Sequence, residues 1–171
     1  MNTLGKILRI SVFGESHGPG VGILIDGCPP GLQVNEELIL KDLDRRRSGA
    51  KGTTARKEYD KPQISSGVYR GVSTGAPIMI MTANTNIRPS DYAGFRDIPR
   101  PGHADMVSRH KYGGYADPHG GGHFSGRLTW GLVAAGSIAR QIIRPALAKA
   151  ELISVGGNEN IEEEIERALK E

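Results

Sequence analysis

The sequence has little that would tie it to a membrane, a disulfide framework or a structural metal. A single cysteine, Cys28, stands among 171 residues, so no internal disulfide can form and a reducing cytoplasm is the expected location. No cysteine and histidine pairs have zinc-finger spacing, so we expect no metal. The longest apolar runs, such as 78–81, are too short to cross a bilayer, and the first residues lack the apolar core of a signal peptide. We therefore expect no membrane partner.

Aromatic residues are also scarce, at 5% of the chain, which weakens the case for stacking on nucleic-acid bases. Charge is unevenly distributed. Residues 151–171 hold seven acids and two bases, whereas residues 1–150 carry a net charge of +8. The densest basic stretch, residues 45–57, contains no acid. A body this basic favours an anionic partner: a phosphorylated metabolite, a nucleotide or a nucleic acid.

Short patterned segments predict strands in the first half of the chain. Polar–apolar alternation over 9–13 and an apolar run over 21–27 each predict one strand. Two more, over 61–69 and 75–83, flank a glycine-rich turn and form a predicted hairpin. Pro77 near the start of the second indicates an edge position, because proline cannot donate a ladder hydrogen bond.

Helical spacing predicts three helices. Asn35 would cap the first, with Ile39 and Leu43 as its apolar pair. The longest is expected over 125–145, and an amphipathic one with an acidic start over 160–170. The expected apolar positions of the longest helix are Leu128, Leu132, Ala135, Ile138, Ile142 and Ile143.

Between the strands and the longest helix, residues 84–124 show almost no apolar periodicity. Long unpatterned segments of compact domains are functional or disordered. The chain has 24 glycines, about twice the usual ~7% share, and they cluster at 14–22, 113–126 and 156–157. Such clusters mark tight turns or a close approach of the backbone to a ligand.

The first glycine cluster contains the loop Gly14–Gly18. His17 can act there as a general acid or base near neutral pH, and Ser16 can bond a phosphate oxygen. A tight turn with a surface histidine explains the same five residues.

A second histidine loop covers residues 100–105. Asp105 could fix the tautomer of His103, and Arg100 could hold an anionic substrate beside it. A loop histidine beside a local ion pair is an equal alternative.

The third segment, residues 120–127, leads into the longest predicted helix. Three glycines expose backbone amides and the helix N-terminus adds positive potential, which together make a phosphate site. Arg127 would lie in the first turn, where a cation opposes the helix dipole unless an anion lies beside it. The segment has neither the Walker sequence nor the Rossmann spacing, and a flexible linker is the alternative.

Taken together and in order, these segments and three others resemble chorismate synthase, over roughly residues 4–148. The segments are 14–18, 42–47, 90–92, 100–105, 111–113 and 120–127. The resemblance implies an α+β fold, a β-α-β sandwich with helices between antiparallel sheets, assembled as a homotetramer. It implies conversion of 5-enolpyruvylshikimate 3-phosphate to chorismate by 1,4-anti elimination of phosphate. Reduced FMN (FMNH2) would be the cofactor, with NADPH as a candidate reductant.

The resemblance also implies roles for single residues. His17 would protonate the departing phosphate, and His103 would protonate or polarise the reduced flavin. The substrate's phosphate and carboxylates would be held by Ser16, Arg46, Arg56, Arg100 and Arg127. The flavin would be contacted by Arg46, His123, Phe124 and Ser125.

Three features depart from the family pattern. The loop around Lys51-Gly52 is shorter than in many members, and His123-Phe124-Ser125 replaces the usual Arg-Ser-Ser. The chain has about half the family's length, so residues 1–150 would be an N-terminal portion of the domain and residues 151–171 an acidic helical segment.

Two alternative functions stay open: an inactive family fragment and a basic nucleic-acid-binding module. A polyanionic substrate explains the +8 body better, so we expect no nucleic-acid partner. We also expect the isolated chain to be inactive, to bind FMN weakly, and to self-associate through uncovered helix faces such as that of Ile138 and Ile142.

Overall fold

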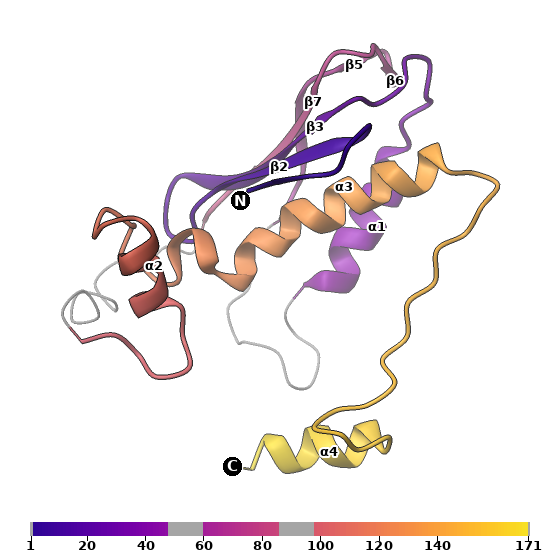
Figure 1. Ribbon diagram of the computed structural model, residues 1–171. Helices are drawn as coiled ribbons and strands as arrows, with labels where there is room; N and C mark the ends of the chain where they lie inside the picture. The colour runs from indigo at the N-terminus through magenta and orange to yellow at the C-terminus, as the bar shows by residue number, and fades with distance from the viewer. Residues whose placement is uncertain (1, 48–59, 86–97, 171) are drawn as a thin grey trace.

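One antiparallel sheet with two helices on one of its faces forms the body of the protein (Figure 1). The computed structural model describes residues 2–47, 60–85 and 98–170. The sheet has the strand order β1-β2-β3-β7-β4, and a small hairpin, β5–β6, forms a second sheet. The strands are β1 (Thr3–Leu4), β2 (Arg9–Gly14), β3 (Gly20–Asp26), β4 (Gln63–Ser66), β5 (Val68–Tyr69), β6 (Val72–Ser73) and β7 (Ile78–Ala83).

Helices α1 (Glu36–Arg46) and α3 (Thr129–Ile142) pack on each other, and α3 also packs on β3. Two short 3-10 turns, η2 (Gly122–Phe124) and η3 (Gly126–Leu128), precede α3. A short helix, α2 (Asp105–Lys111), lies within the segment that has no apolar periodicity, and α4 (Ile161–Ala168) follows α3. The α+β class is therefore confirmed. The described residues contain one large sheet and one layer of helices, so the expected β-α-β sandwich stays a prediction.

Alternation along β3 creates the core between the sheet and the helices. Val21, Ile23 and Ile25 are fully buried, and Ile23 lies opposite Ile80 of β7. Successive side chains of a strand point to opposite faces, so these three share the helix-facing side. Burying an aliphatic side chain of this size contributes about 1.5–3 kcal/mol. Ile78 and Ile80 of β7 are also fully buried, and the helices contribute Ile39 and Leu43 of α1 and Trp130, Ala134 and Ile138 of α3.

Gly131 sets how closely α3 approaches the sheet. A Cβ at this position would lie 2.9 Å from the carbonyl oxygen of Gly22 on β3. Close approach brings the small residues of α3 onto the sheet and turns Leu132 and Ile143 away from it, at 41% and 44% exposed. The expected apolar face of this helix was therefore wrong at these two positions. Ile138, expected to lack cover in the isolated chain, is instead fully buried.

Other sequence predictions are confirmed in detail. The predicted strands 9–13 and 21–27 correspond to β2 and β3. The Asn35 side chain accepts a hydrogen bond from the Leu38 amide, which caps α1 as expected. The predicted hairpin is formed by β4 and β7, with β5–β6 at its tip. The edge position inferred from Pro77 was wrong, because β7 lies between β3 and β4; Pro77 precedes the strand and withholds no ladder hydrogen bond.

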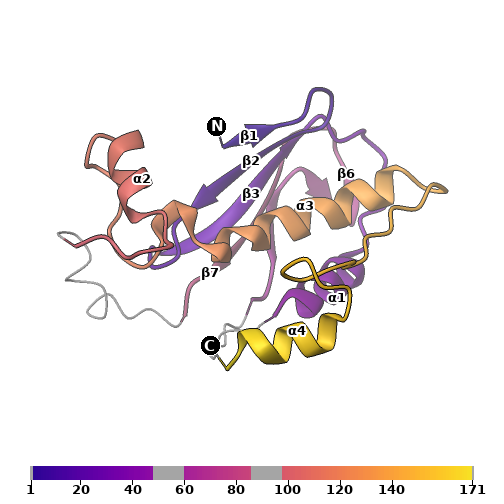
Figure 2. The same cartoon turned by 60° about the horizontal axis from the view of Figure 1, so that its bottom comes forward.

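The C-terminal helix stands apart from the sheet. An extended segment leads from α3 to α4, and Figure 2 shows the same separation of α4 from the strands in a second view. Of the helices in the described ranges, none is both long and apolar enough to span a membrane.

Candidate functional site

Two glycine-rich loops far apart in the sequence meet at one end of the sheet. The first follows β2 and contains residues 14–18; the second contains residues 120–127. The Ser16 amide donates to the Gly122 carbonyl oxygen at 3.1 Å, and His123 Nδ1 lies 3.0 Å from the Gly14 carbonyl oxygen. These backbone contacts bring two of the predicted site segments together.

Gly120 is the point of closest approach between the loops. Its φ is +66°, in the region that favours glycine, and a Cβ there would collide with the His17 ring and lie 2.8 Å from Ser16 Oγ. The amides of this segment are largely used in its own turns, since Gly122 donates to His119 and Phe124 donates to Gly121. The glycines therefore serve close packing more than the exposure of amides that the sequence suggested. η2 and η3 also separate them from the start of α3.

The His17 ring is held at this junction. Its Nδ1 lies 3.0 Å from Ser16 Oγ, and Ser16 itself is buried. A hydrogen bond at one ring nitrogen holds the ring in one orientation, as a general acid or base requires. The structure thus brings Ser16 and His17 together and positions the ring against the second loop.

Asn84, which sequence analysis missed, joins the first loop to Arg127. Its Nδ2 donates to the carbonyl oxygens of Glu15 and Gly18, both at 2.8 Å, and its Oδ1 accepts from Arg127 Nε at 3.1 Å. Asn84 is buried, so each of these bonds is shielded from water. A lone asparagine just after a strand gave no sequence signal for this role.

Arg127 and Arg46 converge on one carboxylate, that of Asp60. Arg127 Nη1 forms an ion pair with Asp60 Oδ1, and Arg46 Nη1 lies 3.4 Å from Asp60 Oδ2. Asp60 is 3% exposed and Arg127 8%. The anion that the placement of Arg127 called for is thus present within the protein. Sequence analysis missed Asp60, which stands between the basic run and the following strand with no local motif.

Arg100 forms a two-pronged ion pair with Asp105. Arg100 Nε and Nη2 donate to the two carboxylate oxygens at 2.9 and 2.8 Å, and Nη2 also donates to the Gly120 carbonyl oxygen at 2.6 Å. The hydrogen bonds from Arg100 lower the pKa of Asp105 from 3.8 to about 2. The local expectation that Asp105 fixes the tautomer of His103 gives way to this pairing, which ties Arg100 to the second glycine loop.

His103 lies on the exposed turn between Arg100 and α2. Its amide donates to the Arg100 carbonyl oxygen at 3.4 Å, so it is attached to the site through that backbone. Arg56 lies outside the described residues. We use the name site cluster for the connected group Ser16, His17, Asp60, Asn84, Arg100 and Arg127, with Arg46 at its border.

An aromatic hollow of about 570 Å³ adjoins the site cluster. Phe124 and Tyr112 line it with ring centroids 5.8 Å apart, and Lys111 Nζ lies 5.2 Å from the Phe124 centroid. A partly exposed aromatic ring beside a cation can stack on the planar ring of a ligand. His123 lines the same hollow, whereas the Ser125 hydroxyl accepts from the Arg127 amide at 3.2 Å and so caps η3.

Glu15 and Asp117 also line this hollow. Burial raises the pKa of Glu15, and the neighbouring Asp117 raises it further. Burial opposes ionisation of Asp117, but hydrogen bonds from His119 outweigh it and lower the pKa of Asp117. Asp117 is therefore the more acidic carboxyl of this pair.

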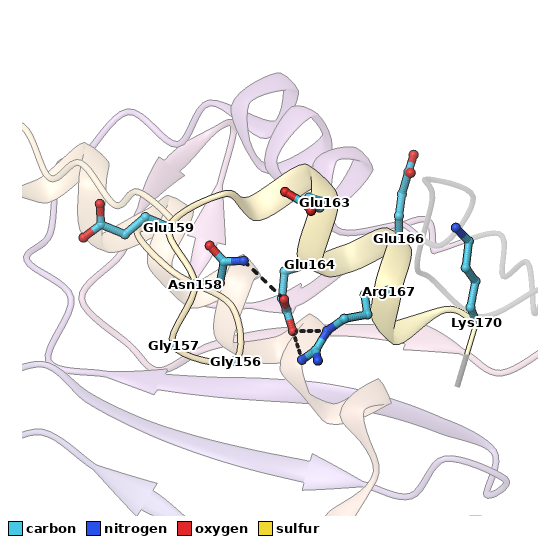
Figure 3. Close-up of a pocket in the computed structure, with 9 residues that line it drawn as sticks. All are labelled: Gly156, Gly157, Asn158, Glu159, Glu163, Glu164, Glu166, Arg167 and Lys170. Atoms are coloured by element: carbon cyan, nitrogen blue, oxygen red, sulfur yellow. Dashed lines mark hydrogen bonds and ion pairs between the residues drawn. The ribbon is translucent and has the colours of Figure 1, made fainter.

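A second hollow, of about 970 Å³, lies on the C-terminal segment (Figure 3). It is formed by α4 and the turn at Gly156-Gly157. Glu164 accepts from Asn158 Nδ2 at 3.4 Å and pairs with Arg167, so its charge is used in holding the turn on the helix (Figure 3). Within the described ranges, no three histidine, cysteine, aspartate or glutamate side chains are placed to hold a metal ion.

Comparisons with known proteins agree with one another. The family model for chorismate synthase matches residues 8–169. The chain is 54% identical to the chorismate synthase of Chitinophaga pinensis over 99% of its own length and 51% of that protein's. It is 51% identical to that of Aeropyrum pernix over 83% of its own length and 37% of that protein's. A solved structure titled as that of chorismate synthase superposes with a TM-score of 0.55 and 28% identity, over 81% of this chain and 34% of that one. The chain thus spans about half or less of the length of these relatives.

Proposed function

Because the chain belongs to the chorismate synthase family, we propose that it carries the phosphate-eliminating part of a site that converts 5-enolpyruvylshikimate 3-phosphate to chorismate. The reaction breaks the carbon–oxygen bond to the phosphate and removes one hydrogen from the ring. A new ring double bond takes up the electrons, so substrate and product differ by phosphoric acid and no net oxidation occurs. The observation that carries this proposal is the convergence of Ser16 and His17 with three arginines.

The arginines would bind the anionic groups of the substrate. Three arginines are tied to the two glycine loops by hydrogen bonds: Arg127 through Asn84, Arg100 through Gly120 and Arg46 through Gly126. Guanidinium groups bind phosphate and carboxylate through paired hydrogen bonds, and a buried setting strengthens those bonds. Arg56 would join them.

His17 would be the acid that protonates the departing phosphate. Phosphate leaves poorly as a trianion, so a positioned proton donor with cations beside it lowers the barrier. The contact between Ser16 Oγ and Nδ1 supports this role because it orients the ring next to Gly120. Ser16 would also bond a phosphate oxygen.

The aromatic hollow fits reduced FMN, and NADPH is the candidate reductant. Phe124 and His123 would hold the ring system, with Ser125 and Arg46 nearby, and His103 would polarise or protonate it. When bound, reduced FMN would supply electron density that assists departure of the phosphate. The protein's own part is to orient the substrate and to exclude water from the site.

The rest of the flavin pocket would come from sequence that the relatives have and this chain lacks. Residues 1–150 would be the N-terminal portion of the domain, and residues 151–171 an acidic helical segment. We propose a cytoplasmic homotetramer for the complete enzyme. A half-built pocket leaves its ligand wet, so the isolated chain should bind FMN weakly and be inactive.

A chimera tests this function. This chain is joined to the part of the Chitinophaga pinensis relative that it does not cover, and chorismate formation is followed by absorbance under anaerobic conditions with reduced FMN. Turnover by the chimera but not by the isolated chain is expected. Turnover by the isolated chain would refute the account of the half-built pocket. A chimera that folds and binds FMN but forms no chorismate would refute the proposed function.

A further inference from the structure

Asp60 is the one carboxylate of the site cluster that contacts two arginines of different elements. Arg46 ends α1, and Arg127 lies in η3, 81 positions later in the numbering. Asp60 is 3% exposed and contacts both guanidinium groups. The proposed function gives a role to each arginine and none to this carboxylate.

The three nitrogens of the Arg127 guanidinium have distinct environments. Nε donates to Asn84 Oδ1 at 3.1 Å, and Nη1 pairs with Asp60. Nη2 is buried and, among the described residues, has no hydrogen-bond partner. A buried donor without a partner is costly. The group keeps this arrangement because the bonds at Nε and Nη1 hold the guanidinium plane and prevent Nη2 from rotating toward another acceptor. The unpartnered nitrogen is where an external oxygen would bind.

Arg46 is fixed in a similar manner. Its Nε donates to Thr129 Oγ1 at 3.2 Å and its Nη2 to the Gly126 carbonyl oxygen at 3.3 Å, while Nη1 faces Asp60. Burial lowers the pKa of Arg46, Asp60 raises it, and the nearby Arg127 lowers it again. The two cations therefore repel each other, and Asp60 is the counter-ion that lets them lie close together.

We propose that Asp60 is a positioning residue, which holds Arg46 and Arg127 side by side and leaves Nη2 of Arg127 directed toward a phosphate oxygen. This inference rests on the proposed function for the identity of that oxygen. Asp60 itself touches no reacting atom. It acts by ordering two guanidinium groups before the substrate binds, so that the ordering cost is not met during binding.

A competing explanation makes the opposite prediction. If Asp60 were only a charge that competes with the substrate, its removal would make the site more positive and strengthen anion binding. If Asp60 positions the arginines, its removal frees them to rotate apart and weakens anion binding. The sign of the change in phosphate affinity upon Asp60→Asn therefore decides between the two.

The test uses the 171-residue chain and nuclear magnetic resonance of arginine side chains. Wild-type Arg127 should give a slowly exchanging Nε–H signal with hindered rotation of its Nη groups. Titration with inorganic phosphate should shift that signal saturably. Asp60→Asn should abolish the hindered rotation and weaken phosphate binding by about tenfold or more, the loss of one charge-assisted hydrogen bond. Unchanged or tighter phosphate binding by Asp60→Asn would overturn the proposal.

Two further variants serve as a control and as a substitute in case Asp60→Asn does not fold. Asp42 lies one turn before Arg46 on α1 and pairs with Arg140 of α3, not with an arginine of the site cluster, so Asp42→Asn removes an ion pair from the same helix and should leave the Arg127 signal and phosphate affinity unchanged. If Asp60→Asn fails to fold, Asp60→Glu keeps the charge but displaces it, and should still weaken phosphate binding. Normal binding by Asp60→Glu in that case would overturn the proposal.

The outcomes separate this inference from the function on which it rests. A wild-type chain with no phosphate-dependent shift at Arg127 would refute the assignment of Nη2. The isolated chain could show the expected Arg127 signal and the expected loss of phosphate affinity in Asp60→Asn while the chimera makes no chorismate. That pair of results would refute the proposed function and leave the positioning role of Asp60 standing.

Discussion

The sheet with its helices and the site cluster are neighbouring regions held together by different forces. Between the sheet and α3, contact is made by fully buried apolar side chains such as Ile23 and Ile138. In the site cluster, contact is made by ion pairs and by hydrogen bonds to loop carbonyls, such as those of Asn84. Apolar packing is tolerant of small changes in direction, whereas hydrogen bonds to charged groups are not. The first region therefore sets stability and the second sets orientation.

The largest effect is expected from substitutions that impair the site cluster and leave the packing of the sheet and helices unchanged. In the chimera, His17→Ala and His103→Ala should each lower turnover by roughly 10²–10⁴-fold, the usual contribution of general acid catalysis. Flavin affinity and the unfolding midpoint should change little, because neither ring packs in the core. Steady-state turnover, flavin titration and thermal unfolding measure the three quantities. Turnover within a few-fold of the parent in both variants would remove these assignments.

Trp130→Ala should instead destabilise the packing between the sheet and the helices. Trp130 is fully buried, and its truncation should lower the free energy of unfolding by about 3–5 kcal/mol. Urea unfolding of the isolated chain measures this. Leu132→Ala, on the same helix but 41% exposed, is the control and should change stability by less than about 0.5 kcal/mol. Equal losses for the two variants would contradict the orientation of α3.

Gly120→Ala tests the junction of the two glycine loops within the site cluster. A methyl group there collides with the His17 ring, so the loops must separate, at a cost of about 1–3 kcal/mol in stability. Gly102→Ala is the matched control, since Gly102 has a similar φ of +72° but open space around its Cβ direction. The difference between the two variants isolates the collision from backbone strain. Urea unfolding that gives the same loss for both would show that the loops do not meet at Gly120.

The smallest effect concerns the Arg100–Asp105 pair. The pKa of Asp105 is lowered to about 2, so the ionised pair stabilises the protein above about pH 4 and this contribution is lost as the pH falls toward 2. With solvent screening, about 1 kcal/mol is expected. Urea unfolding should show a gap between wild type and Asp105→Asn at pH 6 that narrows below about pH 4 and is mostly closed at pH 2. A gap that stays constant with pH, as expected for Trp130→Ala, would contradict an ionic origin.

Local patterns predicted the first region better than the second. Asn35 caps α1 and Ile39 and Leu43 lie within it, so the local spacing of these three residues alone defined the cap and the buried face. The face of α3 was harder, because apolar residues occur on both of its sides and the close contact at Gly131 decides which side is buried. That contact depends on the sheet, which no local window contains.

The site could be predicted only where residues fall in short motifs. Ser16, His17, Arg100 and Arg127 belong to such segments, and the structure connects all four. Asp60 and Asn84 stand alone in the sequence and acquire their roles only when distant loops meet. A buried charge without a partner is unfavourable, so the position of Arg127 implied that an anion was required, but the sequence did not say which residue supplied it.

The most direct test of the central claim is the stoichiometry of a single turnover by the chimera with reduced FMN and a limiting amount of substrate. The claim is that the two glycine loops form one phosphate-eliminating site. It predicts that phosphate and chorismate appear together in equal amounts, and that neither appears when FMN is left out. Phosphate released without chorismate, or released equally well without FMN, would contradict it.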